Sequence, residues 1–212
     1  MLKVKSFEFS PIQENTYILY NEFNECIIID PGCYSDAEKD TLAAFITAME
    51  LVPKMLLNTH CHLDHIFGNK FVAEKYNLIP AFHRGEKPVF DDGPTRGLMF
   101  NMPFDNFTGE PTYLEEGTDI MLGADKMKIL LTPGHSPASL SFYSEKDEFV
   151  ISGDALFLNS IGRTDLPGGN HELLIKSIKD KLLTLPPETI VFSGHGPTTT
   201  IGKEMQLNPF LQ

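Results

Sequence analysis

Four potential metal ligands lie within six consecutive positions of this chain, in the sequence His60-Cys61-His62-Leu63-Asp64-His65. The apolar run 55–57 precedes them, which predicts that the motif leaves the end of a strand. In an extended backbone His60 and His62 point to the same side, so they can share one ion. Asp64 and His65 are adjacent and come where the chain turns toward a helix. They are therefore aimed differently and could hold a second ion.

Three later apolar runs also end in a potential ligand, each preceded directly by a glycine: His135, Asp154 and His195. Side chains that follow strand ends can converge on one rim of a sheet, and the glycine permits a sharp turn and a close backbone approach. Two-metal hydrolytic sites have centres roughly 3.5–4 Å apart. The sequence therefore predicts one compact site built from the motif and these three residues.

Imidazole and carboxylate donors without a thiolate suit zinc, manganese or iron. We expect two divalent ions, with zinc favoured over iron or manganese. The first ion is assigned to three histidines, His60, His62 and His135. The second is assigned to Asp64, His65 and His195, and Asp154 should bridge the two because a carboxylate can bridge where a neutral imidazole cannot. The same residues could instead hold a single ion, with the others orienting its ligands.

Charge and cysteine content limit the partners and the compartment. The 212 residues suit a single domain spanning 1–212, and the formal net charge of −12 argues against a long nucleic-acid groove and for a small-molecule substrate. Three cysteines without a C-x-x-C motif predict a reducing compartment. We expect no membrane span and no signal peptide, and hence a cytoplasmic protein.

Hydrophobic periodicity predicts strands in runs, broken by a few helices. The expected strands are 2–9, 16–20, 26–29 (buried on both faces), 54–58, 79–82, 119–122, 126–131, 139–143, 149–152 and 189–192. The expected helices are 35–50, with a capping box at Ser35 and Glu38, one starting near Ile66 and continuing through 67–76, then about 171–183 and 201–207. This order favours two packed sheets with helices outside over a regularly alternating parallel sheet.

The segment from Gly85 to Pro111 lacks a clear period and contains several prolines and glycines. We interpret it as a long irregular excursion that could include a helical turn. Loops of this length are unusual unless they are functional, so a role in covering the substrate is expected.

The ligand order resembles that of the metallo-β-lactamase superfamily across nearly the whole chain. This resemblance implies an α/β fold, an αββα sandwich with the site along the edge of two sheets. Within the superfamily, the segments 161–165 (Ile-Gly-Arg-Thr-Asp), 193–197 (Ser-Gly-His-Gly-Pro) and 208–210 (Asn-Pro-Phe) resemble the glyoxalase II group, especially its short bacterial members. Glyoxalase II proper carries a C-terminal helical extension with glutathione contacts, and this chain ends about where that extension would begin, which leaves glutathione specificity open.

The resemblance implies a hydrolase that cleaves a thioester of the hydroxyacylglutathione kind by attack of a metal-bound hydroxide, oriented by Asp64. A thiolate leaves readily, so no strong general acid is required. Three alternatives stay open. A persulfide dioxygenase would use one iron held by His60, His135 and Asp154; a lactonase or β-lactamase would attack a ring ester or amide; and a non-catalytic binding module would use the scaffold without its chemistry.

Several other residues have competing interpretations. Arg163 could be a solvated loop charge or could contact substrate. Asp30 could cap its strand or accept a hydrogen bond from a ligand histidine, and we favour the second. Cys61 should be turned away from the neighbouring histidines and pack in the interior. His83 and His171 are not expected to be ligands.

Overall fold

The computed structural model describes residues 1–212 and contains two six-stranded mixed sheets. In spatial order, the first sheet contains β1 (Lys3–Phe9), β2 (Glu14–Tyr20), β3 (Glu25–Ile29), β4 (Val52–Leu57), β5 (Pro80–His83) and β6 (Thr112–Leu114). The second contains β14 (Thr199–Thr200), β13 (Ile190–Ser193), β10 (Phe149–Gly153), β9 (Leu140–Ser144), β8 (Asp125–Leu131) and β7 (Asp119–Leu122). A small hairpin pairs β11 (Leu156–Phe157) with β12 (Ser160–Ile161).

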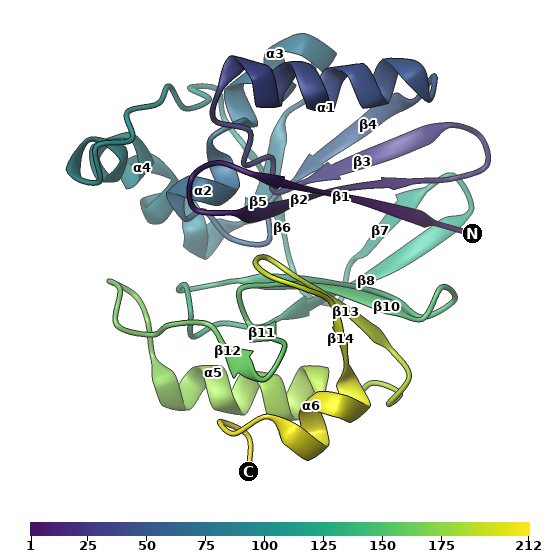
Figure 1. Cartoon of the computed structure of the whole chain (residues 1–212), viewed down its shortest axis with the longest axis vertical. Helices are drawn as coiled ribbons and strands as arrows, with labels where there is room; N and C mark the ends of the chain where they lie inside the picture. The colour runs from purple at the N-terminus through teal and green to yellow at the C-terminus, as the bar shows by residue number, and fades with distance from the viewer.

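Helices lie on the outer faces of the two sheets (Figure 1). The first sheet is covered by α1 (Asp36–Ala48) and α3 (Asn69–Tyr76), and the second by α5 (His171–Ser177) and α6 (Ile201–Leu207). A π-helical turn, Ile178–Leu182, continues α5. The predicted αββα sandwich is confirmed, and every strand expected from the periodicity is present. No helix has the length and unbroken apolar sequence that crossing a bilayer requires.

Strand β3 shows why the two sheets stack as they do. Its residues Cys26, Ile27, Ile28 and Ile29 are all fully buried. Ile27 and Ile29 belong to the apolar cluster between the sheets, whereas Cys26 and Ile28 pack on the helix side with α1. Burial of each isoleucine side chain stabilises the fold by roughly 1.5–3 kcal/mol. The prediction of a strand buried on both faces is confirmed.

Helix α1 begins at the predicted capping box. The Ser35 hydroxyl accepts from the Glu38 backbone N–H at 3.3 Å, and the Glu38 carboxylate accepts from the Ser35 backbone N–H at 2.8 Å. The Glu38 carboxylate thus pairs a backbone N–H that has no partner within the helix. The same carboxylate accepts from the backbone of Ser10 at 2.7 Å, so the cap also joins α1 to the end of β1.

The interpretation of residues 85–111 as an irregular excursion is wrong for residues 85–99 and confirmed for 100–111, which contain no helix or strand. A 3₁₀ turn, Arg84–Glu86, leads into a 13-residue helix, α4 (Lys87–Met99). Pro94 lies inside this helix and lacks the N–H that would bond to the carbonyl of Phe90. The side-chain amide of Asn106 donates to that carbonyl at 2.9 Å instead. A residue beyond the helix therefore restores the bond that proline removes.

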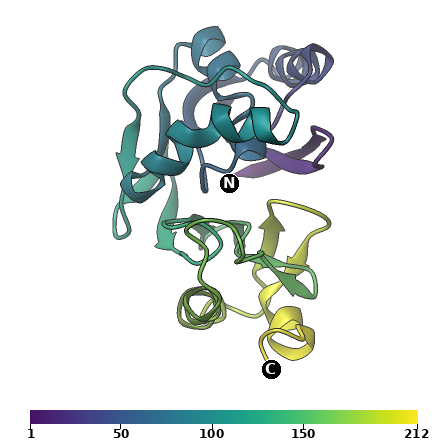
Figure 2. The same cartoon turned by 90° about the vertical axis from the view of Figure 1, so that its left-hand side faces the viewer.

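Two glycines allow α4 to pack closely on its neighbours. A Cβ at Gly93 would lie 2.9 Å from Ile66 Cδ1, and one at Gly97 would lie 2.6 Å from the carbonyl oxygen of Met102. Glycine thus serves close packing here, at a helix-propensity cost of about 1 kcal/mol each. In Figure 2, α4 crosses the near side of the first half of the molecule.

The short helix after the motif begins earlier than predicted. It is α2 (Leu63–Ile66), so Asp64 and His65 lie within a helical turn rather than before one. The backbone N–H of His65 bonds to the carbonyl of His62 at 3.1 Å, which forms the turn. This turn gives Asp64 and His65 directions that an extended strand would not, and the His65 ring lies against that of His60, with ring centroids 4.0 Å apart.

Candidate metal centre

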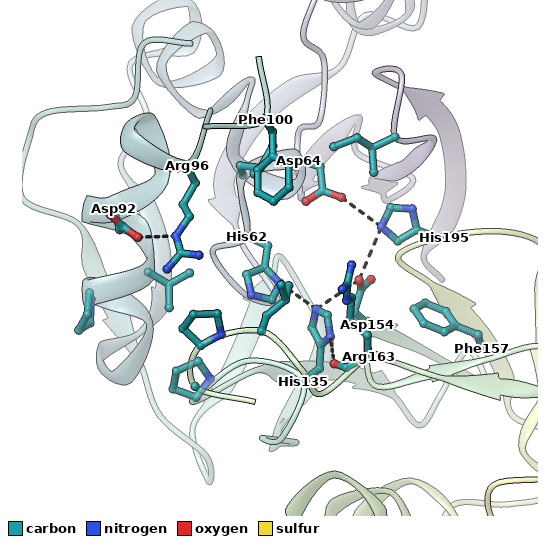
Figure 3. A pocket seen from close by; sticks show the side chains of 18 residues that line it. His62, Asp64, Asp92, Arg96, Phe100, His135, Asp154, Phe157, Arg163 and His195 are labelled. Carbon is teal, nitrogen blue, oxygen red and sulfur yellow. Dashed lines mark hydrogen bonds and ion pairs between the residues drawn. The ribbon is translucent and has the colours of Figure 1, made fainter. Parts of the chain in front are cut away.

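The topology explains why residues distant in the sequence meet. In the second sheet β8 and β10 are each antiparallel to β9, and β10 is parallel to β13. The carboxyl ends of β8, β10 and β13 therefore lie at the same edge, where His135, Asp154 and His195 follow them. The motif follows β4 of the first sheet at that edge. Figure 3 shows five members of the set around one cavity: His62, Asp64, His135, Asp154 and His195.

Three imidazoles form the first group, with one ring nitrogen of each facing a common point. His135 Nε2 lies 2.8 Å from His62 Nδ1 and 3.2 Å from His60 Nε2. Neighbouring ligands of a tetrahedral zinc, with Zn–N bonds near 2.0–2.1 Å, lie roughly 3.3 Å apart. The three nitrogens are therefore spaced as ligands of one ion would be.

The second group joins a carboxylate and two imidazoles. Asp64 Oδ2 lies 3.2 Å from His195 Nε2 and 3.9 Å from His65 Nε2. All three side chains are largely buried; His65 is fully so. This is the combination of one acid and two histidines predicted for the second ion.

Asp154 lies between the two groups. Its Oδ2 is 3.4 Å from His135 Nε2 and 3.6 Å from His195 Nε2, and its Oδ1 is 3.4 Å from His65 Nε2. Asp154 Oδ1 and His65 Nε2 are buried and have no hydrogen-bond partner within the protein. Buried polar atoms are normally paired, so these two atoms fit a bound cation.

The outer ring nitrogens of the histidines are held by hydrogen-bond acceptors. His135 Nδ1 lies 2.8 Å from the carbonyl oxygen of Arg163, and His195 Nδ1 lies 3.0 Å from that of Gln13. Because a carbonyl only accepts, each Nδ1 carries the proton and each Nε2 presents a lone pair to the centre. The backbone thus fixes both the orientation and the tautomer that a metal ligand needs.

Asp30 accepts a hydrogen bond from the outer ring nitrogen of His65, a histidine of the motif, as the sequence predicts. Its Oδ2 lies 3.0 Å from His65 Nδ1 and accepts from the Thr59 hydroxyl at 2.5 Å, while its Oδ1 accepts from the Thr59 backbone at 2.7 Å. The Thr59 oxygen in turn lies 3.1 Å from His60 Nδ1. One carboxylate therefore positions a histidine of each group.

Charge is distributed unevenly across the centre. Burial, with His135 close by, lowers the pKa of His62 to about 3, so this imidazole is neutral and free to coordinate. Burial opposes charge on His65, but the carboxylates of Asp154, Asp30 and Asp64 outweigh it and raise its pKa well above the usual value. Burial also opposes ionisation of Asp154, yet the adjacent His65 holds its pKa well below the usual range. The carboxylates demand a positive charge, which a divalent ion would supply.

Glycines let the ligand loops approach each other. Gly153 has φ +52°, which favours glycine, and a Cβ there would lie 2.5 Å from the Thr59 hydroxyl oxygen. A Cβ at Gly194 would lie 2.8 Å from His65 Cε1. The close approach predicted for the glycines before Asp154 and His195 is confirmed at these two positions.

Glu86, which no sequence pattern predicts as part of the site, is fully buried beside the centre. Its Oε2 accepts from the Cys61 backbone N–H at 3.0 Å and from the Ser136 hydroxyl at 2.6 Å. Its Oε1 accepts from the Ala138 backbone N–H at 2.7 Å. Burial raises the pKa of this carboxyl. Glu86 therefore joins the motif to the loop that carries His135, and the surrounding sequence has no feature that would reveal it.

None of the other residues discussed in the sequence, Arg163, Cys61, His83 and His171, offers a side chain to the two ligand groups. The Arg163 guanidinium donates to Asp165 through Nε and Nη2, both at 2.7 Å, so its carbonyl rather than its side chain supports His135. Cys61 is fully buried in an apolar cluster, as expected. His83 caps the turn after β5 and His171 starts α5, and neither belongs to the ligand groups.

A cavity of about 740 Å³ opens in front of the centre. One side is formed by Val89, Asp92 and Arg96 of α4 and by Phe100 directly after it, and the opposite side by residues of 163–168. Figure 3 shows Arg96 extending from α4 toward His62. The volume lies within the roughly 300–1,000 Å³ typical of small-molecule sites.

Comparisons with known proteins agree with this geometry. The family model of the metallo-beta-lactamase superfamily matches residues 10–195. A probable metallo-hydrolase, YqgX of Bacillus subtilis, is 40% identical over 99% of this chain and 98% of its own length. The hydroxyacylglutathione hydrolase GloC of Haemophilus influenzae is 34% identical, with 99% and 98% covered.

Two solved structures match nearly the whole fold. The BLEG-1 B3 metallo-beta-lactamase is 39% identical, with a TM-score of 0.91 over 99% of this chain and 100% of that one. TTHA1623 in a di-iron-bound form is 35% identical, with a TM-score of 0.88 over 98% and 100%. Relatives of similar identity thus include a hydroxyacylglutathione hydrolase and a metallo-beta-lactamase by name, so similarity alone does not select a substrate.

Proposed function

Because the chain belongs to the metallo-β-lactamase superfamily, we propose that it is a metallohydrolase that cleaves thioesters of the hydroxyacylglutathione type. The observation that carries this proposal is the pair of ligand groups joined by Asp154, facing a cavity large enough for a small thioester. The similarity to GloC supports the thioester class. Three unpaired cysteines support a reducing compartment such as the cytoplasm.

His60, His62 and His135 would hold the first ion and Asp64, His65 and His195 the second, and Asp154 lies between the two groups. Nitrogen donors in the first group and the mixed donors of the second fit zinc, and iron is the alternative because TTHA1623 has been solved with two irons. Such ions lower the pKa of bound water from 15.7 toward 7 and polarise a carbonyl oxygen.

The protein's own residues orient the reactants. Asp64 lines the cavity with Oδ2 against His195, so its carboxylate can accept a hydrogen bond from the attacking water. The backbone carbonyl of Arg163 holds the proton of His135 on Nδ1, and that of Gln13 does the same for His195. Both protons are therefore kept away from the reacting atoms. In the net reaction, water adds to the thioester carbonyl carbon, the C–S bond breaks, and a carboxylic acid and a thiol are released.

The cavity favours a leaving group that departs without strong acid catalysis. Its lining contains no lysine, tyrosine or cysteine that could donate a proton. A thiolate, with a conjugate acid near pKa 8.5, leaves as the anion at neutral pH. The nitrogen of an opened amide must be protonated, so a thioester makes the smaller demand on this lining than a β-lactam does.

A substrate panel tests this proposal, with metal content measured on the same preparation. We expect two equivalents of zinc or iron by mass spectrometry, and turnover of S-lactoylglutathione at least a hundredfold above that of a lactone and of a chromogenic cephalosporin. Chelation should abolish the activity, and zinc should restore it. Oxygen consumption with glutathione persulfide and a single iron would instead establish a dioxygenase, and preferred cleavage of the cephalosporin would establish a β-lactamase.

A further inference from the structure

The wall formed by α4 carries an arginine that the proposed chemistry does not use. Apart from the assigned ligands, the only charged side chains that line the cavity are Asp92, Arg96 and Arg163. Asp92 and Arg96 are four residues apart on α4, and Arg163 lies across the cavity on the loop after β12. The two arginines are the cationic groups that an anionic substrate would meet.

The two guanidinium groups differ in which of their nitrogens already donate a hydrogen bond within the protein. Arg163 uses Nε and Nη2 together on the carboxylate of Asp165, and its side chain is 62% exposed. Arg96 uses only Nε, which donates to Asp92 at 2.6 Å, and its side chain is 35% exposed. Both terminal nitrogens of Arg96 have no protein acceptor, so they can bind another group. Figure 3 shows Arg96 among the side chains that line the same cavity as His62.

The surroundings of Arg96 strengthen such an interaction. Pro88, Val89 and Phe100 share the α4 side of the cavity with it, and Leu166 and Pro167 lie on the opposite side. Apolar walls exclude water and reduce the dielectric screening of a charge. Because the chain has a net charge of −12, an anionic substrate needs a local positive group at the site.

We propose that Arg96 is a specificity-determining residue that binds a carboxylate of the substrate, so that the enzyme selects thioesters carrying a free carboxylate. This inference rests on the proposed thioester hydrolysis for its choice of substrate. A guanidinium presents a planar pair of N–H donors that matches a carboxylate, which a lysine ammonium cannot do. The carboxylate can belong to the acyl or to the thiol portion, and the experiment separates these two sources.

Another ion pair on the same helix provides a matched control. Lys87 and Asp91 are also four residues apart on α4 and lie 2.6 Å apart, but neither lines the cavity. Replacing Lys87 removes one positive charge and one helix ion pair without touching the site. Any difference between variants at positions 87 and 96 therefore reports on the cavity rather than on α4 or on net charge.

The test uses two pairs of simple thioesters with metal-loaded enzyme. In the first pair, the thiol portion is 3-mercaptopropionate or its methyl ester, each S-acetylated. In the second, the acyl portion is a succinyl group or its methyl ester, each on N-acetylcysteamine. We expect wild-type kcat/KM to favour the free acid roughly tenfold to hundredfold in one pair, the magnitude of one charge-assisted hydrogen-bond pair.

Arg96→Ala should reduce that ratio to near one, Arg96→Lys should retain only part of it, and Lys87→Ala should leave it at the wild-type value. The pair that shows the effect identifies which portion carries the carboxylate. A ratio near one in wild-type enzyme for both pairs, or a ratio equally reduced by Lys87→Ala, would overturn the assignment to Arg96.

Binding measurements separate this inference from the hydrolysis it rests on. Thioether ketone analogues of the same acids and esters cannot be hydrolysed, and their affinities can be measured by titration calorimetry. A preference for the acid that disappears in Arg96→Ala supports the carboxylate site even if no thioester is cleaved, which would refute only the proposed function. Thioester cleavage without any acid preference in binding or turnover would refute only the carboxylate site.

Discussion

The metal centre and helix α4 lie on the same cavity but are built in opposite ways. The centre combines mostly buried side chains that follow strands of both sheets, from His60 and His65 at 0% exposure to His195 at 25%. The wall formed by α4 contributes groups that remain partly open to solvent, with Arg96 at 35% and Phe100, directly after the helix, at 58%. The centre is thus buried within the sandwich, whereas α4 contributes partly open side chains to one wall.

The difference extends to how each side chain is supported. Four histidines of the centre have a hydrogen-bond acceptor on the ring nitrogen that faces away from it. The acceptor is Thr59 for His60, Asp30 for His65 and a backbone carbonyl for His135 and His195. Arg96 has a single partner, Asp92, on its own helix. A largely buried side chain with a fixed acceptor holds one geometry, whereas a part-exposed side chain tied only to a part-exposed residue of its own helix can adapt to a ligand. We infer that the centre sets the reaction and α4 sets the substrate.

Asp154→Ala is expected to have the largest effect, because it removes the group that touches both ligand sets. The variant should bind at most one ion in place of two, and kcat/KM should fall at least about 10³-fold, since metal stabilisation contributes several kcal/mol and each 1.36 kcal/mol is a factor of ten. Metal analysis and thioester hydrolysis measure both effects. Asp119→Asn, at an exposed ion pair with Lys126, is the control. Full metal content in Asp154→Ala would contradict the bridging assignment.

Glu86→Gln should have an intermediate effect and tests whether the centre depends on support from the start of α4. The two Glu86 carboxylate oxygens together accept three hydrogen bonds. A glutamine amide has one acceptor oxygen, and its NH₂ group would face one of these donors. Metal affinity should fall roughly 10–100-fold. The free energy of unfolding should fall by about 1–3 kcal/mol.

Chelator competition and urea unfolding separate these two effects of Glu86→Gln. Glu74→Gln, on the exposed side of α3, should change neither. If stability falls while metal affinity stays at the wild-type value, Glu86 is only a folding contact, and the centre is independent of the segment that begins α4.

The same contrast explains what could be predicted from the sequence. The ligands could be found because each follows an apolar strand and three have a glycine immediately before them, which are local features. The strands and the capped helix α1 depend on periodicity and on the pair Ser35 and Glu38, which are also local. The supporting role of Asp30 could be anticipated because it directly follows a buried strand.

Helix α4 could not be predicted, because its stability depends on residues outside it. Pro94, Gly93 and Gly97 all indicate a break when read locally, and each is compensated by a tertiary contact. The acceptor role of Glu86 likewise depends on two loops that only the fold brings together. Helix α2 begins at Leu63, earlier than the sequence predicts, because the hydrogen bond from the His65 N–H to the His62 carbonyl forms its turn within the ligand motif itself.

The smallest expected effect concerns Asn106, and it tests whether α4 can be weakened without disturbing the centre. Asn106→Ala leaves the buried carbonyl of Phe90 unpaired beside Pro94, so the free energy of unfolding should fall by about 1–3 kcal/mol. Metal content should stay at two ions, and KM for the preferred thioester should rise because the wall carrying Arg96 is less well held.

A double-mutant cycle with Pro94→Ala isolates this one hydrogen bond. Alanine at position 94 supplies a backbone N–H for the Phe90 carbonyl, so Asn106→Ala should cost about 1 kcal/mol less in that background. Asn106 Oδ1 also accepts from the Phe107 backbone N–H at 2.8 Å, but that loss is common to both backgrounds and cancels. Equal costs in the two backgrounds would show that Asn106 does not replace the missing proline N–H. Loss of metal from Asn106→Ala would show that the wall and the centre are a single cooperative unit, which would remove the basis for assigning them separate roles.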